Sequence, residues 1–243
     1  MRMRLAALAL GSLLLPASAG ALTVAPATFT CPIDGKPFTV SVMTSGTSYG
    51  SYFDGQLVGP IESPAPLVAC PGNGFIIDRD GSYTESELAK LRPFVASAQY
   101  RGWLAADSAY YRLAKQREFM GDTPDRIADA LLEATWEAGG DLYPRHAGEA
   151  LDALRQLAAS KAAQGEDAIG TRMLAGELER RLGRFDEARA TFTALQADPA
   201  FPGKGSEEAR SYRRKVAEAQ LQLIAAHDTG RARLDDDGKL ARF

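Results

Sequence analysis

Cysteine and histidine are scarce in this sequence, with two of each among 243 residues. Two cysteines exclude a zinc site made of four thiolates, and the two histidines lie too far apart for zinc-finger spacing. A basic excess is also missing, because 28 Lys and Arg face 31 Asp and Glu. The resulting charge of −3 argues against a broad nucleic-acid-binding face. We therefore expect no nucleic-acid partner, no cofactor and no metal.

Long apolar segments are missing as well. Residues 5–15 form an apolar run of 11 residues, too short to cross a bilayer that needs about 20. This run follows Arg2 and Arg4 and precedes small residues at which cleavage after Ala19 or Ala21 is possible. That pattern is typical of a signal peptide, here residues 1–21. The sequence predicts a periplasmic or secreted protein with no membrane span in the mature chain.

Alanine is nearly absent from one part of the chain and abundant in the rest. Residues 31–84 contain 2 Ala and 14 Gly plus Pro, whereas residues 85–243 contain 32 Ala. Because Ala favours helices while Gly and Pro mark turns, the fold type changes near residue 84. We predict an α+β fold, mostly α, in which a small ribbon-like β module over 29–84 precedes a helical domain over 85–228. The remaining residues, 229–243, are expected to form a flexible tail.

Hydrophobic periodicity and turn residues give the expected elements. Short strands are predicted at 38–43, 51–58 and 66–69. Helices are predicted near 85–98, 103–119, 124–138, 144–163, 167–181, 185–197 and 206–227. Thr84 and Glu87 match the T-x-x-E capping box, which predicts where the first helix begins.

The sharpest pattern in the helical part lies over residues 171–199 and matches the spacing of a tetratricopeptide repeat. The matching positions are Gly176, Gly183, Phe185, Ala188 and Phe192. Small residues at two of these positions allow two antiparallel helices to approach closely, while the aromatic rings fill the space to the next hairpin. The pattern predicts a tetratricopeptide-like array, and a generic amphipathic bundle is the alternative.

Two Cys-Pro segments precede the helices. Cys31-Pro-Ile-Asp34-Gly and Cys70-Pro-Gly-Asn73-Gly each look like half of a zinc ribbon, whose knuckle reads Cys-Pro-x-Cys-Gly. The order of two knuckles, a capped helix and tetratricopeptide-like helices resembles an uncharacterised bacterial family, a domain of unknown function, over residues 29–200. Members of that family usually keep four cysteines. Here Asp34 and Asn73 replace the second cysteine of each knuckle, so the metal site is not carried over.

The resemblance also implies a pairing for the two remaining cysteines. A ribbon fold places its knuckles side by side, which would make Cys31 and Cys70 neighbours. In an exported protein, neighbouring cysteines normally oxidise, and we expect a structural disulfide between them. A metal site and a reactive thiol pair are the alternatives.

A second candidate metal site lies between Asp78 and Glu87, a stretch that looks like positions 3 to 12 of an EF-hand calcium loop. Ile76 stands at the first ligand position, and no helix precedes the loop. The same residues are explained by an Asp-Gly turn followed by the capping box. Two further residues, His146 and His227, lie at predicted helix ends, where we expect them to be solvated.

The features together predict a non-enzymatic scaffold that binds an unidentified envelope protein or peptide. Binding would use the curved face that stacked helical hairpins leave free. One alternative is an enzyme or small-ligand binder with its site at the seam between the two modules. Another is a calcium-responsive module that uses the Asp78–Glu87 loop.

Overall fold

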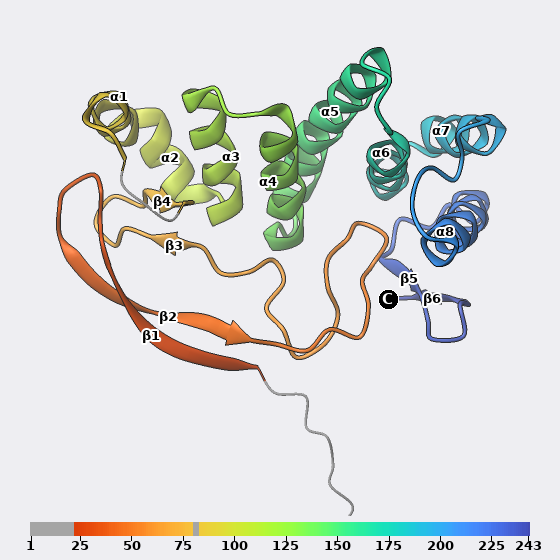
Figure 1. Cartoon of the computed structure of the whole chain (residues 1–243), viewed down its shortest axis with the longest axis horizontal. Helices are drawn as coiled ribbons and strands as arrows, with labels where there is room; N and C mark the ends of the chain where they lie inside the picture. The colour runs from red at the N-terminus through yellow and green to blue at the C-terminus, as the bar shows by residue number, and fades with distance from the viewer. Residues whose placement is uncertain (1–21, 80–82) are drawn as a thin grey trace, which may run out of the picture.

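The computed structural model describes residues 22–79 and 83–243. The predicted signal peptide, residues 1–21, lies outside the described residues. The α+β fold is confirmed, because small antiparallel strand pairs precede a series of helices. The helices follow one another in a row, and the strands of the N-terminal part run along one side of it (Figure 1).

The chain begins with a long β-ribbon. Strand β1 (Thr23–Thr30) pairs antiparallel with β2 (Pro37–Ser45), and Phe29 lies opposite Phe38. Neither strand contains a fully buried residue, so the ribbon contributes little to the hydrophobic core. The β structure therefore starts before residue 29, where we had placed the boundary of the module.

A second strand pair lies closer to the helices. Strand β3 (Val68–Ala69) pairs antiparallel with β4 (Ile76–Ile77). The predicted strand at 51–58 is wrong, since this stretch forms only a single bridge between Ser51 and Leu57. Gly55, with φ of +92°, explains the difference, because it turns the chain back within this stretch and so prevents a continuous strand.

Three short helices follow, each started by a side-chain cap. They are α1 (Glu85–Val95), α2 (Ala98–Ala106) and α3 (Ala109–Met120). The capping box of Thr84 and Glu87 is confirmed. Ser97 and Ser108 cap α2 and α3 by accepting hydrogen bonds from backbone N–H groups three residues later. The single helix predicted at 103–119 is therefore wrong, because α2 ends at Ala106 and the Ser108 cap begins a new helix.

The remaining helices agree with the predicted positions to within three residues at either end. They are α4 (Pro124–Glu137), α5 (Leu142–Ala163), α6 (Ile169–Arg181), α7 (Phe185–Ala197) and α8 (Glu207–Ala225). None of the helices in the described ranges is both long and apolar enough to cross a membrane.

The N-terminal part packs along the helices and shares their core. Ile76 belongs to the same buried cluster as Leu113 and Leu151, residues of α3 and α5. Farther along, the Asp54 carboxylate lies 2.8 Å from Nη1 of Arg181 in α6. About fifty residues cannot bury enough apolar surface by themselves, and this shared core supplies what the small module lacks.

The C-terminal residues form structure where we had expected a flexible tail over 229–243. Strand β5 (Ala232–Leu234) pairs with β6 (Leu240–Arg242), and Ala232 is buried against α8. The Ala232 carbonyl accepts a hydrogen bond from the backbone N–H of Phe53, at 3.0 Å. The N-terminal part and the C-terminus are thus joined through this hairpin.

Candidate functional site

The two Cys-Pro segments form equivalent turns. In each, the cysteine N–H donates to the carbonyl five residues later, and the N–H four residues later donates to the cysteine carbonyl. Glycine lies four residues after the cysteine in both turns, with φ of +71° at Gly35 and +70° at Gly74, a conformation that other residues rarely adopt. This shared geometry is what the zinc-ribbon resemblance led us to expect of two knuckles.

The predicted disulfide between Cys31 and Cys70 is present and joins the two knuckles, with Cα atoms 5.5 Å apart. The residues that replace the missing cysteines contact the opposite knuckle. Nδ2 of Asn73 is 3.5 Å from Sγ of Cys31, and the carboxylate of Asp34 approaches Gly72 of the second knuckle. Both cysteines are buried in one cluster with α1 residues such as Leu91, so the bridged knuckles pack against the first helix.

The five repeat positions meet at the α6–α7 hairpin. Gly176 in α6 contacts the ring of Phe192 in α7, and Gly183 has φ +74° in the turn between the helices. Ala188 and Phe192 are fully buried in one cluster, and Phe185 packs against its edge. The hairpin is therefore closely packed, as the spacing of these residues predicted.

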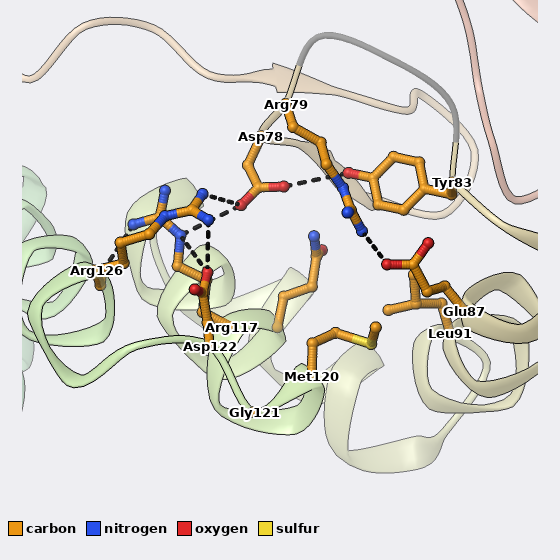
Figure 2. Close-up of a pocket in the computed structure, with 11 residues that line it drawn as sticks. Asp78, Arg79, Tyr83, Glu87, Leu91, Arg117, Met120, Gly121, Asp122 and Arg126 are labelled. Carbon is orange, nitrogen blue, oxygen red and sulfur yellow. Dashed lines mark hydrogen bonds and ion pairs between the residues drawn. The ribbon is translucent and has the colours of Figure 1, made fainter.

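A charged pocket lies at the seam between the β segments and the helices. It forms because Gln116 of α3 acts as a partner for strand β4: its Oε1 accepts from the N–H of Ile76, and its Nε2 donates to the carbonyl of the same residue. This docking places Asp78, two residues farther on, next to Arg117 (Figure 2).

Asp78 is the centre of an ion-pair network in this pocket. Its Oδ2 lies 3.2 Å from Nε of Arg117 and 3.3 Å from Nη2 of Arg126, while its Oδ1 accepts from the Tyr83 hydroxyl at 3.2 Å (Figure 2). Arg126 also contacts Asp122 at 3.0 Å. Two guanidinium groups therefore neutralise the carboxylate that the calcium hypothesis needs as a ligand.

Glu87 is held in a similar way at the other side of the pocket. Its carboxylate accepts from the backbone N–H of Thr84, at 2.7 Å, and from Nη2 of Arg79, at 2.8 Å. These bonds lower the pKa of Glu87 to about 2. The guanidinium of Arg79 also lies 4.2 Å from the ring centre of Tyr83. Glu87 therefore serves the start of α1, as the capping-box interpretation states.

The seam pocket is small and its charges cancel. It holds about 240 Å³ and is lined by three arginines and three carboxylates that pair with one another. Asp80, the remaining candidate calcium ligand, lies outside the described residues. Across residues 22–79 and 83–243, no group of three or more His, Cys, Asp or Glu side chains could hold a metal.

A larger and less polar groove lies on the helical row, between α3, α4 and α5. It holds about 580 Å³. Its floor contains Ile127 and Leu131 of α4 together with Ala153 and Leu157 of α5. All of its lining residues come from these three helices, so the N-terminal strands leave it open. Sequence reasoning missed this groove, because it depends on how three helices pack.

Sequence reasoning also misplaced one of the two histidines. His146 is fully buried, with Nε2 2.9 Å from Oδ1 of Asp107 and its ring stacked on Tyr111 at 4.4 Å between centroids. Our expectation of a solvated helix end is wrong here, because the bend before α3 turns Asp107 inward as a partner. His227, by contrast, is exposed beyond the end of α8 as expected.

Comparisons with known proteins found no relative of this chain. No protein-family model matches the chain, and no curated protein or solved structure matches it.

Proposed function

We propose that the protein is an exported, non-enzymatic scaffold that binds a protein or peptide segment in the groove between α3, α4 and α5. The observation that carries the proposal is the groove itself: about 580 Å³, with an apolar floor and with no lining residue from the rest of the described chain. Volumes of this size are typical of sites that bury a ligand, and helical grooves commonly receive peptide segments.

The proposed binding surface is not the one that the repeat pattern predicts. We had assigned binding to the curved face that stacked hairpins leave free. In this chain the segment from Asp54 to Ile76 occupies one side of the helical row, through contacts such as that between the Ala65 carbonyl and the Tyr110 hydroxyl, at 2.8 Å. A partner is therefore better accommodated by the groove.

Export of the protein is part of the same proposal. It is supported by the signal-peptide pattern over residues 1–21 and by the disulfide, which persists in oxidising compartments such as the periplasm. The partner would then be an envelope or secreted protein. The repeat spacing around Gly176 and Ala188 supports a tetratricopeptide-like origin for the helical row.

The charged pocket around Asp78 is a less favoured alternative site. Its volume is less than half that of the groove, and a ligand would have to break the pairs of Asp78 with Arg117 and Arg126 before it could bind there.

The experiment compares two alanines of α5. Purified protein without residues 1–21 would be screened against a displayed peptide library, and each selected peptide would be tested on Ala153→Glu and Ala159→Glu. Ala153 lines the groove, whereas the exposed Ala159 does not. We expect Ala153→Glu to weaken binding at least tenfold and Ala159→Glu to leave it unchanged. Peptides that bind both variants equally would show that the groove is not the site.

A further inference from the structure

The acidic rim of the groove indicates the kind of partner that fits it. Besides its apolar floor, the groove is lined by Glu118, Glu149 and Asp152, and none of its lining residues in 22–79 and 83–243 is Lys or Arg. We infer that its occupant is an amphipathic helix whose apolar face is bordered by Lys or Arg. This inference rests on the proposed function and adds the chemistry of the partner to it.

The spacing of the apolar residues in the floor suits the packing of another helix against it. Ile127 and Leu131 are four residues apart on α4, and Ala153 and Leu157 are four residues apart on α5. Side chains four residues apart form the ridges between which another helix packs. The lining residues of α5 extend from Glu149 to Ser160, a length of about 16 Å at 1.5 Å per residue. That length accommodates about three turns of a bound helix.

The rim carries negative charge at neutral pH. Burial alone would raise the pKa of Glu149, but hydrogen bonds from Lys115 and from the Tyr111 hydroxyl outweigh burial and hold the pKa below its usual value. Lys115 also pairs with Glu118, at 3.0 Å, so one lysine is shared by two carboxylates. With the exposed Asp152, the rim keeps an excess of negative charge that complements a basic partner.

A neighbouring groove shows that the excess of negative charge is confined to the groove between α3, α4 and α5. The groove between α5, α6 and α7 is lined by Arg155 and Arg172 as well as by Glu179 and Glu187. Nη2 of Arg155 lies 2.9 Å from Glu179 and 2.5 Å from Glu187, so the charges there are paired within the protein. A basic partner is therefore attracted to the α3–α5 groove and not to the whole helical row.

The test uses three synthetic helical peptides of about 14 residues. The first has Leu at positions i, i+3, i+4 and i+7 with Lys on the flanks; the second replaces each Lys by Glu; the third keeps Lys and replaces each Leu by Ser. Fluorescence anisotropy would give the dissociation constant of each peptide. We expect the first to bind at least tenfold more tightly than the other two, and to weaken as salt is raised.

Matched charge reversals separate the groove from general attraction to an acidic protein. Asp152→Lys changes the rim, whereas Asp186→Lys makes the same change at an exposed position of α7 outside it. We expect the first variant to weaken binding of the Leu–Lys peptide at least fivefold and the second to change it less than twofold. Equal effects of the two variants would overturn the inference.

The outcomes also distinguish the inference from the proposed function. If the Leu–Lys and Leu–Glu peptides bind equally and Ala153→Glu abolishes both, the groove binds peptides but the basic partner is wrong. If the Leu–Lys and Ser–Lys peptides bind equally, attraction is merely electrostatic and the inference is again wrong. If none of the peptides binds, or if Ala153→Glu has no effect on those that do, the inference fails together with the assignment of the groove.

Discussion

Gly176 lies directly against the ring of Phe192, so close that a Cβ atom at position 176 would be 2.6 Å from Cε2 of that ring. Real Cβ atoms do not approach other atoms so closely, and Gly176→Ala must therefore displace either the ring or helix α7. We predict a loss of about 1–3 kcal/mol in the free energy of unfolding, as is usual for an overpacked core. Denaturant unfolding measures it.

The control for this substitution is Gly148→Ala, in the N-terminal half of α5. A Cβ atom there meets no atom within 4 Å. Because Ala favours a helix over Gly by about 1 kcal/mol, this variant should be slightly more stable than the wild type. The two substitutions are chemically identical, so a difference in sign isolates the contact with Phe192. Equal stabilisation by both would show that the close α6–α7 contact is absent.

The Cys31–Cys70 bridge gives the second prediction. It closes a loop across 39 positions of sequence, which in the chain-entropy model stabilises the fold by about 4 kcal/mol. Replacing both cysteines by Ala should lower the free energy of unfolding by roughly this amount. Mass spectrometry of exported, alkylated but unreduced protein should find no modified cysteine. Two alkylated cysteines in the folded protein would contradict the assignment.

The third prediction tests whether the two turns are zinc-ribbon knuckles. Asp34 and Asn73 occupy matching positions, three residues after Cys31 and Cys70; Asn73 lies next to the bridge, and the Asp34 carboxylate faces Gly72 of the second knuckle. Changing both to Cys and keeping the protein reduced would place four thiolates together, the set that zinc prefers. We expect one tightly bound zinc per chain by metal analysis after dialysis.

Reduced wild-type protein is the control for the zinc experiment. Its two thiolates, one carboxylate and one amide form a poor donor set, so we expect it to lose zinc on dialysis. If the four-cysteine variant also fails to retain zinc, the turns do not share the geometry of a ribbon, and the resemblance to the four-cysteine family loses its main support.

The features that the sequence predicted well are local ones. The Thr84–Glu87 capping box depends on residues three positions apart, and the α6–α7 hairpin is encoded within residues 171–199. Helix bounds were less accurate where a short break interrupts an otherwise continuous pattern. Helix α2 ends at Ala106 and Ser108 caps the next helix, yet the residues on both sides of this break favour helices.

The features that the sequence did not predict depend on distant contacts. Asp107 and His146 are 39 residues apart and become a buried pair only because α3 and α5 pack together. The groove is similar: the apolar positions Ile127 and Ala153 were visible in the sequence, but their spacing does not indicate that they line a groove between three helices.

Glu133 of α4 gives the last prediction, which concerns pH. Burial and the nearby Asp129 raise the pKa of Glu133 to about 7; Glu137 also raises it, while Arg117 of α3 acts in the opposite direction. A raised pKa means that the folded protein binds this proton more tightly than the unfolded chain does. Stability should therefore fall as pH rises from about 4.5 to about 7, and the whole penalty should be present above that range.

Glu133→Gln removes the charge but keeps the size of the side chain, so it should remove this penalty. We predict that the variant is more stable than the wild type by about 1–3 kcal/mol at pH 8, an amount reduced for partial solvent screening, and about equally stable at pH 4.5. Denaturant unfolding at several pH values measures the difference. Glu218→Gln, an exposed position in the middle of α8, is the control for the loss of one negative charge. A gain at Glu133 that is the same at both pH values, or no larger than that of the control, would show that Glu133 is ionised without cost in the folded protein.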